Sequence, residues 1–328
     1  MLERALRLIV GIVLVLVLAV AALWAVRLAG FGYLLAVNQE SPKPVRPDIP
    51  FAPLTEPSLH DPDNPTKVFR VDMARVEHDY PLTRAERASL TPANVLSLNQ
   101  EEVDQLYGRL TAGPIPDGPY LGDLFFARGE TLKPRLEEIL GGLEGRVAAE
   151  KVELAEAAGR ALWKGKMFYR DDRILRNFVD DFHPLRPLID APDKLPRATV
   201  PREGPLKYVL PTTDVWLVFP AKLYCGQSLL DGRRESVIID YAFTDDIPGY
   251  QEHPDALAGR NGLRIRDEIR MIRPGFYLGR AYTNRIFLLD FILYNDEVAK
   301  AGLDGFARGD EVAEDCWPGE QDRTAEGN

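Results

Sequence analysis

The sequence predicts an α+β protein with an N-terminal transmembrane helix, a helical segment and then a mostly antiparallel β-barrel or strongly curved sheet. Three observations lead to this prediction: an unbroken apolar run near the start, helix signals after residue 90, and period-two alternation within residues 215–294. The 328 residues carry a net charge of −10, which argues against wholesale nucleic-acid binding. Two cysteines and four histidines exclude a Cys-rich disulfide scaffold and a cysteine-rich metal site.

The apolar run covers residues 8–26, nineteen apolar or small residues that reach roughly 28 Å as a helix, about the thickness of a hydrocarbon core. Arg4 and Arg7 precede it and favour a cytoplasmic N-terminus. A cleaved signal peptide is the alternative, because Ala19-Val20-Ala21 resembles a cleavage site. Since apolar residues continue beyond that point, we expect an uncleaved anchor over residues 1–37, in contact with the bilayer through 8–26.

Residues 38–66 form a Pro-rich linker, since eight prolines between Pro42 and Pro65 disfavour both helix and sheet. An anchor, a spacer and a modest acidic body favour a single-pass protein of a bacterial inner membrane, with its soluble part in the periplasm. In that compartment Cys225 and Cys316 could form a disulfide. The alternative is a buried free thiol at Cys225 and an exposed one near the tail.

A helical segment is expected over residues 67–113. Thr91-Pro92 is a good helix start, and Asn99 with Glu102 resembles a capping box. The helix that follows has one apolar face, formed by Val103, Leu106, Tyr107 and Leu110.

The β-barrel-like domain is expected over residues 114–300, with helices inserted between 134 and 162 where strong helix formers gather. Apolar or alternating segments predict its strands at 163–169, 174–179, 215–226, 235–244, 263–272, 276–282 and 286–294. Residues 301–328 read as an acidic, partly disordered tail.

Glycine and aromatic residues mark the first half of this domain. Gly118-Pro119-Tyr120-Leu121-Gly122 is followed by Trp163-Lys164-Gly165-Lys166, and a β-rich half comes after them. This order resembles the lipocalin-like (calycin) barrels, in particular the GXWXG-type bacterial proteins, with Tyr120 in place of the tryptophan. The resemblance implies a cavity for an apolar ligand and no particular reaction.

A second resemblance concerns the layout of the chain. Membrane-tethered lipase foldases also have an anchor, a Pro-rich spacer and a helical part, with the signature Arg-x-x-Phe-Asp-Tyr. Residues Arg75 to Tyr80 are similar to it, with His78 in place of phenylalanine. This resemblance implies a steric chaperone for an exported partner.

Candidate ligand-binding residues come from the aromatic and charged positions of the strands. They are Tyr120, Trp163, Tyr224, Asp240, Tyr241, Arg266, Arg270 and Tyr277. The rings either line a cavity or fill a solid core. The arginines either hold a ligand anion by bidentate bonds or form an ion-pair ladder on the outer face of the sheet.

Metal, cofactor and catalytic signals are weak. Asp180, Asp181 and His183 lie close together, but the prolines at 184 and 187 indicate a loop, and we expect neither a metal nor a cofactor. The familiar catalytic motifs are missing from the sequence. Three functions remain: binding of a lipid or other apolar molecule without catalysis, an accessory or chaperone role for an exported partner, and an enzyme with Asp240, Arg266, Glu268 and His183 at the barrel mouth.

Overall fold

The computed structural model describes residues 45–54, 71–125, 163–181, 186, 189–202, 205–310, 312–313 and 316. The chain divides into two units, Met1–Val45 and Arg46–Asn328, and only Val45 of the first unit is described. The expected anchor at 8–26 and the inserted helices at 134–162 lie outside the described residues. Among the helices that are described, none has the length and apolar character needed to cross a bilayer.

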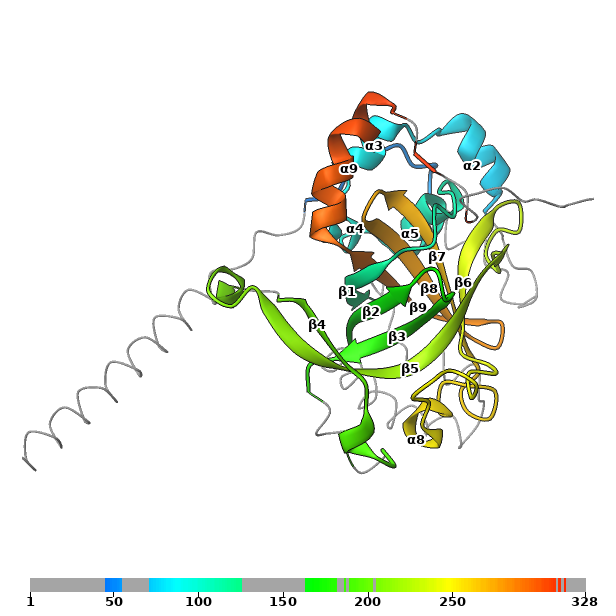
Figure 1. Ribbon diagram of the computed structural model, residues 1–328. Coiled ribbons are helices and arrows are strands. Elements are labelled where there is room, and N and C mark those ends of the chain that lie inside the picture. The colour runs from blue at the N-terminus through cyan, green and yellow to red at the C-terminus, as the bar shows by residue number, and fades with distance from the viewer. Residues whose placement is uncertain are drawn as a thin grey trace, which may run out of the picture. The chain divides into compact units, whose positions relative to one another are not determined.

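Eight antiparallel strands of the described chain close into a barrel (Figure 1). They are β1 (Gly118–Phe125), β2 (Trp163–Tyr169), β3 (Ile174–Val179), β5 (Thr212–Gln227), β6 (Glu235–Asp240), β7 (Ile265–Arg273), β8 (Phe276–Thr283) and β9 (Ile286–Tyr294). Their order is β3-β2-β1-β9-β8-β7-β6-β5, and pairing of β3 with β5 closes the ring. The structure thus confirms an antiparallel barrel in an α+β protein.

Alternation along the strands divides the barrel into an inner and an outer face, because successive side chains of a strand point to opposite sides. In β6, for example, Val237 and Ile239 belong to the inner apolar cluster. In β8, Phe276 and Leu278 belong to an outer cluster that packs against helices. Both faces of this part of the wall are therefore buried, and charged residues on either face need partners.

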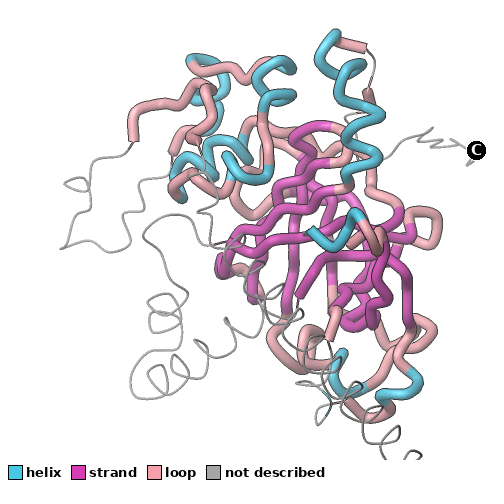
Figure 2. The backbone as a smooth tube through the Cα atoms, turned by 90° about the vertical axis from the view of Figure 1, so that its left-hand side faces the viewer, coloured by secondary structure: helices cyan, strands magenta, loops and turns pink. Residues whose placement is uncertain are grey.

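In the described part of the chain, four helices precede the barrel: α2 (Met73–Asp79), α3 (Arg84–Ser89), α4 (Pro92–Val95) and α5 (Gln100–Gly108). Helix α5 begins with the predicted capping box, in which Asn99 and Glu102 exchange side-chain to backbone hydrogen bonds. Leu106 and Tyr107 of α5 are fully buried in the outer cluster. Figure 2 shows these helices gathered outside the strands, where they form a layer over one end of the barrel.

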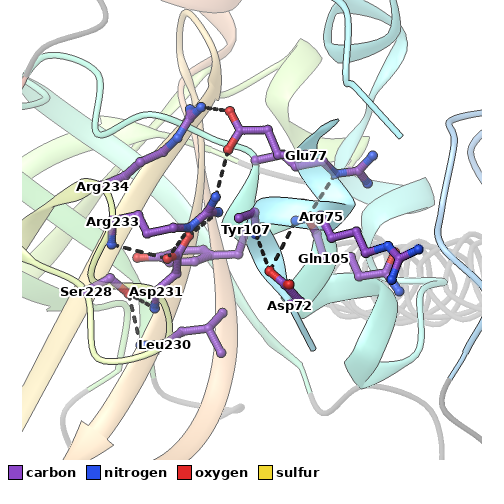
Figure 3. Close-up of polar contacts among 12 residues, drawn as sticks. Asp72, Arg75, Glu77, Gln105, Tyr107, Ser228, Leu230, Asp231, Arg233 and Arg234 are labelled. Atoms are coloured by element: carbon purple, nitrogen blue, oxygen red, sulfur yellow. Dashed lines mark hydrogen bonds and ion pairs between the residues drawn. The ribbon is translucent and has the colours of Figure 1, made fainter. Parts of the chain in front are cut away.

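Helix α2 is fixed to the connection between β5 and β6 by ion pairs (Figure 3). Glu77 contacts both Arg233 and Arg234, and Arg233 also pairs with Asp231 at 2.8 Å. Glu77 comes from the segment that is similar to the foldase signature, so one charged group of that segment holds the helix in place.

A last helix, α9 (Asp296–Arg308), occupies the start of the expected tail. The Asn295 side chain accepts a hydrogen bond from the Val298 N–H, and Gly309 ends the helix with a φ of 88°. Phe306 is fully buried and stacks under the Arg87 guanidinium. Burial of Phe306 against the helical layer explains why ordered structure extends past the expected boundary at residue 300.

Two further differences concern strand ends. The strand expected over 235–244 stops at Asp240, because the Asp240 carboxylate accepts a hydrogen bond from the Ala242 N–H and turns the chain. Strand β4 (Arg197–Pro201) is an addition that pairs with the start of β5. The remaining short elements among the described residues are η3 (Pro192–Lys194), η4 (Pro205–Tyr208) and α8 (Glu252–Asp255).

A disulfide joins Cys225 of β5 to Cys316, across a sequence separation of 91 residues. Cys316 is fully buried in the inner cluster, and Val312 packs against the same cluster. The disulfide thereby holds the C-terminal segment against the barrel.

Candidate ligand-binding cavity

A cavity of about 270 Å³ lies inside one end of the barrel. Its walls are mainly apolar: Leu124, Trp163, Phe219, Tyr241, Leu257, Ala258, Leu263, Ile265, Ala281, Leu288, Leu289 and Phe291, with Lys166, Asn177 and Asp267 as polar members. The connection between β6 and β7, which contains α8, supplies Leu257, Ala258 and Leu263. Figure 1 places α8 at the end of the barrel opposite the helical layer.

The other end of the barrel is filled by its own side chains. Tyr120 makes edge-to-face contacts with Phe168 and Tyr277, at centroid distances of 5.6 and 5.7 Å. The Tyr277 hydroxyl donates a hydrogen bond to the Pro114 carbonyl. The interior therefore contains a packed core at one end and a cavity at the other.

A buried ion pair borders the cavity. Lys166 Nζ lies 2.9 Å from Asp267 Oδ2, and their side chains are only 3% and 6% exposed. The same ammonium donates to Tyr241 Oη at 2.7 Å and to Asn177 Oδ1 at 2.8 Å. Since an unpaired charge in such a place would be very costly, these partners are what allow lysine to lie inside the barrel.

Aromatic rings surround the ammonium as well. Lys166 Nζ lies 5.3 to 5.5 Å from the ring centroids of Trp163, Tyr241 and Phe291. Burial lowers the pKa of the Lys166 ammonium, and the neighbouring Asp267 opposes this shift. Burial also raises the pKa of the Tyr241 hydroxyl well above its usual value, so this group is a hydrogen-bond donor at neutral pH.

A β-bulge brings Lys166 into the interior. The register between β2 and β3 shifts between Trp163 and Gly165, so that Trp163 and Lys166 both line the cavity although they are three residues apart. Gly165 has a φ of 148°, and a Cβ at this position would lie 2.1 Å from the Tyr120 carbonyl oxygen. Only glycine fits here without movement of the backbone.

A second irregularity lies on the facing strand at Phe219, which has a φ of 49°. Asn177 Nδ2 donates to the Phe219 carbonyl, and the Phe219 N–H donates to Asp255 Oδ1 at 2.8 Å. Asn177 thus binds the carbonyl group of this strained residue, and Asp255 of α8 binds its N–H group.

The structure places four of the eight candidate residues on the inner face. Trp163 and Tyr241 line the cavity. Tyr120 and Tyr277 belong to the packed end of the barrel. These two rings therefore fill a solid core and do not line a cavity.

The other four candidates lie on the outer face. Tyr224 donates a hydrogen bond to Asp240, and Arg266 pairs with Glu268 at 3.2 Å. Arg270 is fully buried beneath α5, where its guanidinium donates to the Ser236 hydroxyl and to several backbone carbonyls.

The arginines therefore lie on the outer face of the barrel, as the second interpretation expected. Their contacts differ from a cross-strand ladder, since Arg266 pairs with Glu268 of its own strand and Arg270 donates to a hydroxyl and to backbone carbonyls. Asp240, Arg266 and Glu268, grouped above as a hypothetical active site, share that outer face and do not meet in the cavity. His183 lies outside the described residues. Within the described part of the chain, no cluster of His, Cys, Asp or Glu has the arrangement of a metal site.

Lys166, Asn177 and Asp267 are not among the ligand-binding residues predicted from the sequence. For Asp267 a signal exists, because it is the one acidic residue that alternates with Ile265 and Ile269 on the apolar face of its strand. Lys166 gives no such signal. Simple alternation places Trp163 and Lys166 on opposite faces of the strand, and the bulge brings both to the inner face.

Comparison of the chain with protein-family models, with curated proteins and with solved structures found no match. The barrel is compatible with a lipocalin-like architecture, and the family resemblance rests on the sequence pattern alone.

Proposed function

We propose that this protein binds a lipid or another apolar small molecule in the cavity of its barrel. One observation carries the proposal: a largely apolar cavity of about 270 Å³ lies beside the buried Lys166–Asp267 ion pair inside the barrel. Small-molecule sites have volumes of roughly 300–1,000 Å³, apolar walls and a few placed polar groups. This cavity has such walls and polar groups, and its volume is just below that range.

The location of the protein in the cell is part of the same proposal. A single-pass anchor at residues 8–26 would hold the barrel near the bilayer of a bacterial inner membrane, on the periplasmic side. The disulfide between Cys225 and Cys316 supports an oxidising compartment, since such bonds rarely persist in the cytosol.

A cavity-filling variant tests the binding function. Ala281 lines the cavity, so Ala281→Phe places a ring in the space that a ligand would use. Native mass spectrometry of the full-length protein should show a co-purifying apolar molecule, which the variant loses while it stays folded. Ala301→Phe at an exposed position of α9 is the control and should retain the molecule. Equal retention by all three proteins would contradict binding in this cavity.

Docking of an exported polypeptide is a second candidate function, and the loop between β4 and β5 favours it. Tyr208, Val209 and Leu210 are consecutive and are 83%, 77% and 54% exposed. Contiguous exposed apolar residues of this kind mark interaction surfaces. Replacement of all three by serine should abolish cross-linking to a co-expressed partner while ligand binding in the cavity continues. Unchanged cross-linking would remove this candidate.

A further inference from the structure

Lys166, Asp267, Asn177, Tyr241 and Trp163 form a polar group beside the cavity. Nearly all of their side-chain donors and acceptors are paired with one another. An ammonium has three N–H donors, and those of Lys166 reach Asn177 Oδ1, Tyr241 Oη and Asp267 Oδ2 at 2.7 to 2.9 Å. An amide has two donors, and those of Asn177 reach the Phe219 carbonyl at 3.0 Å and Tyr241 Oη at 3.1 Å.

The remaining donors are occupied in the same way. Trp163 Nε1 donates to Asn177 Oδ1 at 2.9 Å, and the Tyr241 hydroxyl donates to Asp267 Oδ2 at 3.1 Å. The amide oxygen of Asn177 and the hydroxyl oxygen of Tyr241 each accept two hydrogen bonds. This group therefore has no N–H or O–H left to offer to a ligand.

One acceptor remains, the second oxygen of the Asp267 carboxylate. Among the described residues, no hydrogen bond reaches Asp267 Oδ1, whereas Oδ2 accepts two. Asp267 is 4% exposed and borders the cavity. Its side chain keeps 6% of its surface exposed, and we infer that Oδ1 is the oxygen that faces the cavity.

The chemistry of this oxygen selects among ligand head groups. A hydroxyl would donate a charge-assisted hydrogen bond to it, of a kind stronger than a neutral one. A carboxylate would meet a negative oxygen with no donor beside it. An ammonium would leave one positive charge uncompensated, because Lys166 and Asp267 already neutralise each other. An ether of the same size accepts hydrogen bonds but donates none.

We propose that the ligand of this cavity is an amphiphile whose polar end is a neutral hydrogen-bond donor, such as an alcohol, and that this end binds Asp267 Oδ1. The inference rests on the proposed function and specifies its ligand class. The apolar part of the molecule lies against Leu289, Phe291 and their neighbours.

Matched probes test the inference with the full-length protein by isothermal titration calorimetry. Octanol and its isomer heptyl methyl ether contain the same atoms but differ in the hydroxyl donor, and octanoate replaces the hydroxyl by an anion. Octanol should bind about tenfold more tightly than the ether, and octanoate should bind most weakly.

The outcomes separate the two proposals. Equal affinity of octanol and the ether, or tightest binding of octanoate, would overturn the donor inference and leave apolar binding in place. Absence of binding for all three probes would overturn the proposed function and the inference with it.

A paired variant gives a second measurement. Lys166→Met with Asp267→Leu replaces the ion pair by apolar groups, so the variant should still bind the ether and should lose the preference for octanol. Tyr224→Phe removes a hydroxyl from the outer face and serves as the control, in which the tenfold preference should persist. A preference that persists in the paired variant would contradict a role of Asp267.

Discussion

At the scale of single residues, the interior of the barrel depends on charges that find partners within it. Lys166 and Asp267 are both buried, and Asn177 and Tyr241 complete their hydrogen bonds. A buried pair of this kind contributes little net stability compared with apolar residues, whereas loss of one partner is costly. The pair is thus better explained by what it presents to the cavity than by the stability it provides.

A double-mutant cycle tests this account. Lys166→Met and Asp267→Leu should each lower the free energy of unfolding by about 3–5 kcal/mol, because each leaves one buried charge alone. The double variant should be more stable than either single variant, with a coupling of about 2 kcal/mol or more. Urea unfolding of the full-length protein measures all four states.

Lys222 and Asp246 supply the control, since here too an ammonium and a carboxylate pair at 2.8 Å, but on the surface. Their side chains are 38% and 69% exposed, and solvent screens the interaction. Lys222→Met should leave the unfolding midpoint nearly unchanged. Additive losses at Lys166 and Asp267 would show that the two residues do not act as a pair.

The bulge at Gly165 leads to a second prediction at the residue scale. Gly165→Ala forces a Cβ against the Tyr120 carbonyl and should cost about 2–4 kcal/mol of unfolding free energy. Gly118→Ala is the control, because Gly118 also has a positive φ, 78°, but has open space where its Cβ would be. It should cost only about 1–2 kcal/mol. Equal losses in denaturant unfolding would mean that close packing at Gly165 is unimportant.

At the scale of elements, helices cover the barrel wall near one end, and a disulfide ties the wall to Cys316. Arg270 of β7 donates to the Tyr107 carbonyl of α5 and lies under the Tyr107 ring, so the helical layer and the wall form one packed unit. Cys316 reaches the inner cluster from beyond α9. The apolar cavity inside the barrel lies at the other end, near α8.

Reduction of the disulfide should therefore lower stability. Closing a loop of 91 residues restricts the unfolded chain, and its loss should cost about 2–5 kcal/mol. Thermal unfolding with and without dithiothreitol measures this difference. A Cys225→Ser/Cys316→Ser variant should unfold at the lower temperature in both conditions. An unchanged wild-type midpoint after complete reduction would contradict a stabilising role.

At the scale of the whole molecule, buried tyrosines set a limit on alkaline stability. Burial raises the pKa of Tyr120 to about 12, and it raises the pKa values of Tyr241 and Tyr277 well above 10. In the unfolded chain these hydroxyls ionise near pH 10, so the folded state retains protons that the unfolded state has lost. The stabilisation is complete below about pH 10 and is lost as the pH rises through the folded-state values.

We accordingly expect the free energy of unfolding to fall steadily between about pH 10 and 12. Chemical unfolding at a series of pH values, together with tyrosinate absorbance, measures both processes. The buried tyrosines should ionise only as the protein unfolds, because burial holds their pKa values above the ordinary one. Ionisation of all tyrosines before unfolding would contradict the burial described above.

The sequence by itself determined the local elements of this protein. Strands β6 and β7 and the capping box of α5 follow from alternation and from side-chain to backbone hydrogen bonds, which depend only on neighbouring residues. Tertiary structure alone decided the cavity. Lys166 and Asp267 are 101 residues apart, and two bulges and barrel closure bring them together. Pairing across such a distance depends on strand register, and a single extra residue in a bulge exchanges the inner and outer faces of a strand.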